Sequence, residues 1–63
     1  MRRFETPQEC GDEISRLKSA TRLPDVTYIP YELASSGWII ARFVRVIRKE
    51  DPNQIFMMFD AFV

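Results

Sequence analysis

The segment WIIARFVRVIRK, residues 38–49, is the main determinant of the architecture of this chain. It is dominated by β-branched and aromatic residues, which are typical of β-strands. Two segments rich in turn-forming residues flank it, ASSG at 34–37 and EDPN at 50–53. The sequence therefore predicts a long central strand over residues 38–49, bounded by a turn at each end.

On either side of this segment, residues 26–33 and 55–63 have the same strand-like composition. Pro30 cannot donate a ladder hydrogen bond, so the first of these strands is predicted to lie at an edge. Residues 7–21 are predicted to form a helix, with Thr6 as N-cap, Glu9 three residues later as in a capping box, and Pro24 ending it. The predicted fold is α+β, with one N-terminal helix on a three-stranded antiparallel meander (αβββ). Residues 1–4 are either a tail or an extra short strand.

The composition indicates a single small domain spanning residues 1–63. Sixty-three residues lie near the lower limit for unaided folding, where disulfides, metals or further subunits usually add stability. The only cysteine, Cys10, cannot form an intrachain disulfide, and without histidine the chain lacks the usual ligands of structural zinc. We therefore expect no metal and no cofactor, and we expect homo-oligomerisation, as a dimer, or partner binding to supply the missing stability.

Charge and hydropathy narrow the expected setting. Nine basic and nine acidic residues give zero net charge, so there is no global attraction to nucleic acid or to an anionic membrane. The N-terminus has no signal-peptide pattern and no apolar run is long enough to cross a bilayer. Together with the lone cysteine, this predicts a cytoplasmic protein without a membrane partner.

The two faces of the sheet follow from the strand register. If both connections have four residues, Leu33 pairs with Trp38 and Lys49 with Gln54, and side chains alternate between faces. A connection of odd length would exchange the partners. We assign the helix to the more aliphatic face, which in this register carries Ile29, Tyr31, Leu33, Trp38, Ile40, Val44, Val46, Ile55, Met57, Phe59, Ala61 and Val63.

The opposite face is expected to be uncovered, because one thin helix shields only one side of the sheet. Asp60 lies diagonal to Arg45 there, close enough to pair. A contiguous apolar patch usually marks a binding surface. The predicted partner or oligomer interface comprises Tyr28, Phe43, Arg45, Ile47, Phe56, Met58, Asp60 and Phe62. Residues 55–59 also form a candidate free edge, to be covered by residues 1–4, a second copy or a partner strand.

No feature favours catalysis, so we expect no enzymatic activity. Histidine, the usual general base, is absent. Cys10 is predicted to pack in the core rather than to react, since Glu9, Asp12 and Glu13 would oppose a thiolate. These three carboxylates match no calcium loop and are read as a solvated first helical turn.

The leading hypothesis is a non-catalytic, self-associating protein-interaction module, such as a small inhibitor, adaptor or sequestering protein. Its short length is typical of proteins encoded by phages or mobile elements, an analogy from size alone. An alternative is a single-stranded nucleic-acid-binding sheet that uses Trp38, Arg42, Arg45 and Arg48. Nucleic acid is the less favoured partner, because the arginines divide between the two faces. A third possibility is a small-molecule site at a subunit junction.

Overall fold

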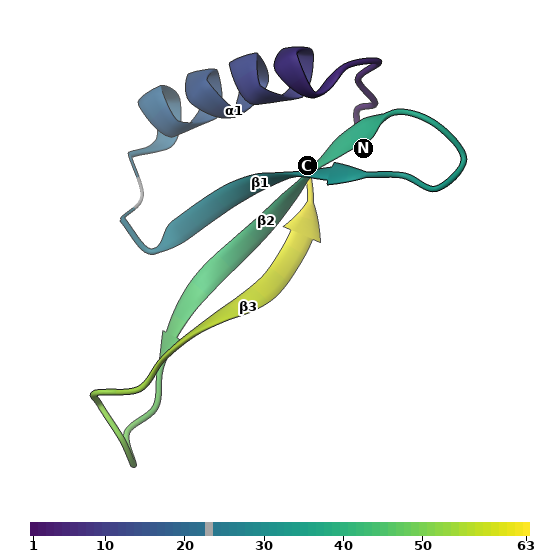
Figure 1. The fold of residues 1–63 in the computed structure, drawn as a ribbon. Coiled ribbons are helices and arrows are strands. Elements are labelled where there is room, and N and C mark those ends of the chain that lie inside the picture. The colour runs from purple at the N-terminus through teal and green to yellow at the C-terminus, as the bar shows by residue number, and fades with distance from the viewer. Residues whose placement is uncertain (23) are drawn as a thin grey trace.

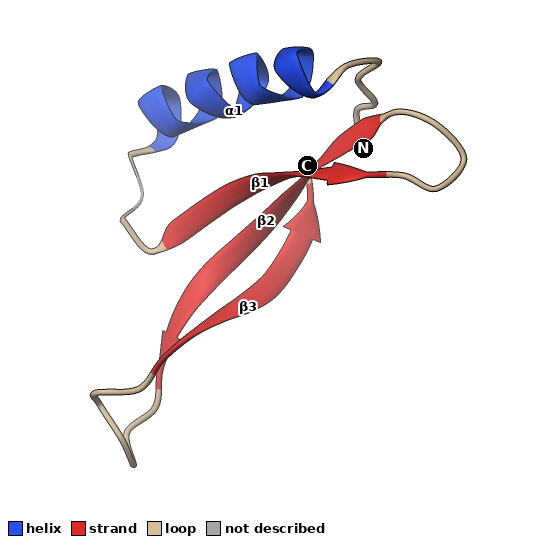
Figure 2. Ribbon diagram, viewed as in Figure 1, coloured by secondary structure: helices blue, strands red, loops and turns tan. Residues whose placement is uncertain are grey.

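The computed structural model of the chain describes residues 1–22 and 24–63. The elements are helix α1 (Pro7–Thr21) and strands β1 (Val26–Glu32), β2 (Trp38–Ile47) and β3 (Ile55–Phe62). The three strands form one antiparallel sheet in the order β1-β2-β3, with α1 lying across one side of it (Figures 1 and 2). The predicted αβββ arrangement is confirmed.

The bounds of α1 follow from its sequence signals. The Thr6 hydroxyl accepts the Glu9 backbone N–H at 3.2 Å, and Pro7 begins the helix with its φ already suited to it. The Glu9 carboxylate accepts the backbone N–H of Glu5 at 3.4 Å, one residue earlier than in a standard capping box. At the other end, Arg22 adopts a left-handed conformation with φ of 46°, and its N–H donates to the Lys18 carbonyl.

The core lies between α1 and the halves of β1 and β2 beneath it. Cys10 and Ile14 of the helix pack there with Tyr28 and Ile40 of the sheet and with Phe4. Among the described residues, α1 contacts β1 and β2 but not β3. The far half of the β2–β3 hairpin therefore extends beyond the helix with both of its faces open (Figure 1).

The β1–β2 register differs by one residue from the predicted one. Trp38 pairs with Glu32 rather than with Leu33, because the connection contains five residues instead of four. As anticipated for an odd-length connection, the side chains of β1 change places between the faces. Tyr28, only 7% exposed, now lies under the helix, whereas Ile29 and Tyr31 lie on the opposite face.

The β2–β3 register follows the prediction over only part of its length. Ala41 pairs with Phe62 as expected, but an irregularity between Arg42 and Phe43 shifts the pairing, so that Phe43 lies opposite Phe59. Such a bulge moves all side chains of the bulged strand that lie on one side of it to the opposite face. As a result, Ile55, Met57 and Phe59 lie on the side away from α1, against expectation.

The N-terminal segment holds the sheet at one point instead of forming a strand. Phe4 and Trp38 exchange two backbone hydrogen bonds, of 2.8 and 2.7 Å, and the Arg2 N–H donates to the carbonyl of Val63. Gly37, with φ of +89°, lets the chain pass so close that an added Cβ would lie 3.1 Å from the Phe4 carbonyl oxygen. Residues 1–4 thus meet the end of β2 and leave the outer edge of β3 without cover from this segment.

The molecule is extended for its mass. Its radius of gyration is 13.4 Å, against about 11 Å for a compact chain of this length. Its accessible surface is 4919 Å², against about 4,200 Å² for a compact monomer of this mass. The excess is roughly 700 Å². The overhanging hairpin and the uncovered side of the sheet account for this shape.

Candidate interaction face

The sheet face turned away from α1 is the most distinctive surface of the molecule, and we call it the open face. Tyr28 and Ile40 point toward the helix, so alternation sends their neighbours in β1 and β2 to the other side. The bulge then fixes which residues of β3 join them. The open face carries the large apolar side chains Ile29, Tyr31, Phe43, Ile47, Ile55, Met57, Phe59 and Phe62.

Four aromatic rings form a continuous chain across the open face. Phe59 contacts Phe43 with ring centroids 5.7 Å apart and Phe62 at 4.8 Å, and Phe62 contacts Tyr31 at 5.9 Å. Their tilted and edge-on geometries are those preferred by aromatic pairs. The rings fix one another in place while Tyr31, Phe59 and Phe62 each remain about half exposed.

Ile39 and Ala41 lie between these rings in the middle of the sheet. Each is only 1% exposed, although neither belongs to the cluster of core residues under the helix. Their strand partners are Tyr31 and Phe62, both on the open face. The aromatic layer therefore already shields a small second core, and its own outer surface is what remains in contact with water.

A shallow apolar hollow lies beside the ring chain. It is lined by Thr27, Ile29, Phe43 and Met57, from all three strands. Within its lining no polar atom is exposed, and it is open to solvent. The hollow and the neighbouring rings give the open face the relief into which a side chain of another molecule can pack.

The predicted interface residues divide between the two sides of the sheet. Phe43, Arg45, Ile47 and Phe62 lie on the open face as expected. The other four do not: Tyr28 is buried under the helix, and Phe56, Met58 and Asp60 lie on the helix side of the hairpin, beyond the end of α1.

Sequence reasoning placed five open-face residues on the helix side: Ile29, Tyr31, Ile55, Met57 and Phe59. A five-residue connection and a bulge caused the error, since each shifts alternation by one position. Leu33, the residue that lengthens the connection, is apolar like the strand residues near it, so composition marks neither the longer connection nor the bulge.

The charged residues near the sheet are paired differently from the prediction. Asp60 accepts the Arg42 Nε–H at 2.5 Å rather than pairing with Arg45, and Arg45 lies 3.9 Å from a carboxylate oxygen of Asp25. Arg48 stacks over the Phe56 ring at 4.8 Å. Of these, only the Arg45–Asp25 pair lies on the open face, where Arg45 is opposite Met57 and between Phe43 and Ile47 along β2.

The residues proposed for nucleic-acid binding are not brought together. Trp38 packs against the core, and Arg42 is tied to Asp60 on the helix side. Arg48 also lies on that side, through its contact with Phe56, whereas Arg45 borders the open face. The four residues therefore form no common basic stripe, although the exposed rings of the open face resemble those on which bases stack.

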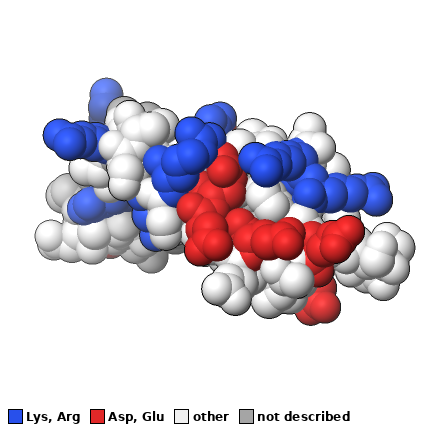
Figure 3. Space-filling view, turned by 90° about the horizontal axis from the view of Figure 1, so that it is seen from above, with Lys and Arg blue, Asp and Glu red and all other residues white. Residues whose placement is uncertain are grey.

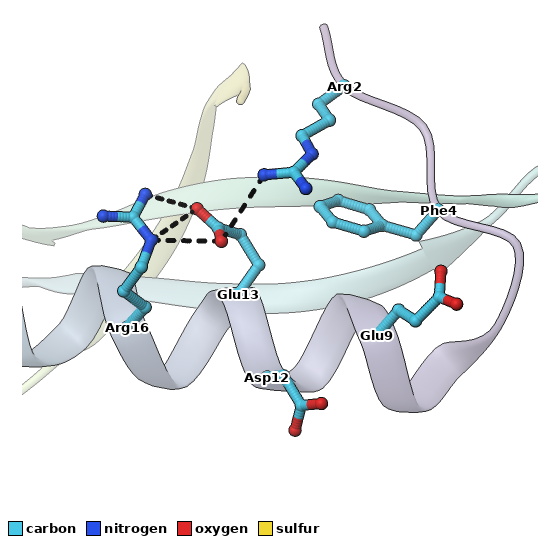
Figure 4. Close-up of a pocket in the computed structure, with 6 residues that line it drawn as sticks. All are labelled: Arg2, Phe4, Glu9, Asp12, Glu13 and Arg16. Carbon is cyan, nitrogen blue, oxygen red and sulfur yellow. Dashed lines mark hydrogen bonds and ion pairs between the residues drawn. The ribbon is translucent and has the colours of Figure 1, made fainter.

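The helix side carries most of the charge. Figure 3, seen from above, shows a continuous acidic band with basic side chains on both sides. In Figure 4, Arg2 and Arg16 both point toward Glu13, while Asp12 points away. Arg16 Nε–H donates to Glu13 at 2.9 and 3.1 Å, and Arg2 lies 3.6 Å away. Arg16 thus pairs with Glu13, three residues before it in the helix.

These contacts perturb the titration of Glu13. The hydrogen bond from Arg16 lowers the pKa of the Glu13 carboxyl, and the positive charges of Arg16 and Arg2 add to the effect. The same partner raises the pKa of the Arg16 guanidinium. The arrangement is a clamp between the N-terminal segment and α1.

Cys10 is inaccessible. Its side chain has no exposed surface, and its Sγ lies 3.5 Å from the Ile39 carbonyl oxygen, to which the thiol donates. Burial raises the pKa of the Cys10 thiol, which keeps it protonated at neutral pH. This is the environment of a packing residue.

Across residues 1–22 and 24–63, no three His, Cys, Asp or Glu side chains are grouped so as to hold a metal ion. In the same residues, no helix is sufficiently long and apolar to cross a membrane. No family model, curated protein or solved structure matches the chain.

Proposed function

We propose that this chain is a non-catalytic protein-interaction module that engages another protein chain through the open face. The observation that carries the proposal is the chain of exposed rings from Tyr31 to Phe43, built on a buried layer of Ile39 and Ala41. Large apolar patches on small proteins usually mark interaction sites, and aromatic residues and methionine are enriched in the centres of interfaces. A role as inhibitor, adaptor or sequestering protein fits a module of this size.

The position of charge on the open face supports a protein partner. The chain of rings is apolar, and the one ion pair among the described residues of the face, Arg45–Asp25, carries no net charge. Arginine beside aromatic residues and methionine is typical of the composition of protein interfaces. A basic nucleic-acid platform would need cations distributed among the rings.

Site-specific photo-crosslinking tests the proposal. Phe59 on the open face and Phe56 on the helix side belong to the same strand, so each can be replaced in turn by a photo-crosslinking phenylalanine analogue. In the cells that produce the protein, we expect protein adducts, with this chain or with another, from position 59 and few from position 56. Adducts from position 59 should disappear when Met57→Glu is added and persist with Met58→Glu. Equal labelling from both positions, or none from position 59, contradicts the proposal.

Binding of single-stranded nucleic acid is the second candidate, favoured by the exposed rings alone. It predicts retention on single-stranded DNA or RNA that weakens steeply with added salt, because phosphate contacts release counterions. Arg45→Ala should then reduce binding more than Arg42→Ala, since only Arg45 borders the rings. Absence of binding at low salt rules this candidate out.

A further inference from the structure

We infer that the occupant of the open face is a second copy of this chain, packed face to face about a two-fold axis. This inference rests on the proposed function and names the partner. The two sheets would lie against each other with their helices outside, in an α/β/β/α stack with about 10 Å between the sheets. Phe59, which contacts both Phe43 and Phe62, would lie near the axis.

The area of the open face matches the requirement of a stable dimer. Seven of its apolar residues are between 40% and 57% exposed. With roughly 200 Å² for each side chain, they offer on the order of 700 Å². A standard interface buries about 800 Å² on each partner. The estimate also agrees with the roughly 700 Å² by which the chain exceeds the surface of a compact monomer.

The small core gives an independent reason for a permanent partner. Among residues 1–22 and 24–63, only seven, counting the two beneath the rings, are buried apolar groups. Cys10 is the chain's only cysteine, so no intrachain disulfide can offset this deficit. A partner that is always present can supply the missing stability. A second copy of the chain is such a partner, because it is made whenever the chain is made.

The charges permit self-packing. In a two-fold interface each residue can meet its own counterpart, so a charge at the centre would face a like charge. Among the described residues, the open face carries one ion pair, Arg45–Asp25, with Arg45 opposite Met57 and next to Phe43 along the face. Each arginine therefore keeps its own counter-ion when two copies meet.

Two adjacent methionines provide a matched pair of test variants. Met57 is 47% exposed on the open face, and Met58 is 56% exposed on the helix side of the same strand. By sedimentation equilibrium of the purified chain, we expect a dimer for the wild type and for Met58→Glu. Met57→Glu should raise the dimer dissociation constant at least about 100-fold, because on each copy a carboxylate, even beside its cross-strand neighbour Arg45, would lose its hydration in the interface. Met57→Leu should retain the wild-type constant.

Any of the following outcomes would overturn the face-to-face dimer. Equal loss with Met57→Glu and Met58→Glu indicates pairing along the β3 edge, where both side chains approach the partner. A monomeric wild type at micromolar concentration excludes the second copy, and the proposed function then survives only if position 59 still crosslinks to a different protein. If Met57→Glu does not fold, crosslinking of the purified wild-type background decides: self-adducts from position 59 and not from 56 support the dimer, and their absence overturns it.

Discussion

The two glycines of the chain occupy opposite situations. Gly11 lies inside α1, and an added Cβ there would meet nothing within 4 Å. No close approach of another described residue therefore requires a glycine at this position. Gly37 has φ of +89°, and an added Cβ would lie 3.1 Å from the Phe4 carbonyl oxygen. One glycine is a weak point in a helix, and the other is required by the turn.

These situations predict opposite effects of the same substitution. Gly11→Ala should raise the free energy of unfolding by about 1 kcal/mol through helix propensity. Gly37→Ala should lower it by about 1 kcal/mol or more, because alanine disfavours positive φ. Urea denaturation monitored by circular dichroism measures both. Two effects of the same sign would contradict the account of the turn.

The Glu13 clamp predicts a pH dependence. The folded-state pKa of Glu13 lies below its ordinary value, so ionised Glu13 contributes stability above the ordinary pKa, and that contribution is lost as the pH falls through the folded-state pKa. Glu13→Gln should therefore be less stable than wild type at neutral pH, and the difference should shrink on acidification. Urea denaturation midpoints of both proteins, measured from neutral to acid pH, check this. Asp12→Asn is the control, because Figure 4 shows no ion pair from Asp12 to the other residues drawn. A difference independent of pH would exclude the clamp.

At the scale of elements, the identity of each helix and strand could be predicted, because local signals determine it. Thr6, Pro7 and Pro24 delimit the helix, and β-branched and aromatic residues mark the strands. Register could not be predicted in the same way. Residues 55–59 are apolar on both faces, so a slip of one position exposes no charge and buries none, and the pattern leaves it unspecified.

The same uncertainty in register limited the prediction of the open face. An uncovered apolar face was predictable from the excess of apolar strand residues over one thin helix. Which side of β1 and β3 forms it depended on a five-residue connection and a bulge. The ion pairs could not be predicted either. Arg16 follows Asp12 by four residues and Glu13 by three, so spacing alone allows either pair, and Arg2, from outside the helix, adds its charge at Glu13.

The N-cap of α1 predicts a measurable contribution at this scale. Thr6→Ala removes the oxygen that accepts the Glu9 N–H and should cost about 1 kcal/mol of folding free energy. Thr6→Asp retains an acceptor and should stay close to wild type. Thermal denaturation followed at 222 nm compares the three proteins. Equal losses in both variants would show that the cap bond contributes nothing.

At the scale of the whole molecule, folding and association are expected to be linked. If the dimer is the stable form, its melting temperature should rise with protein concentration, because mass action favours the associated folded state. Differential scanning calorimetry over a hundredfold dilution measures this. A melting temperature that does not change with concentration would mean that the monomer is stable without its partner.

Salt separates the two candidate functions at the same scale. An apolar open face should associate almost equally at low and high ionic strength, because its one described ion pair, Arg45–Asp25, carries no net charge. Nucleic-acid binding would weaken many-fold over that range. Sedimentation at two salt concentrations, beside filter binding of single strands, distinguishes them.

The enclosed thiol of Cys10 has a practical consequence. Because it is the chain's only sulfhydryl and has no exposed surface, a chromogenic thiol reagent can react with it only after α1 detaches from the sheet. The rate of labelling then reports how often α1 detaches, without any engineered probe. Comparing this rate in dilute and concentrated solution would show whether the helix detaches within an intact assembly or only after the two copies separate.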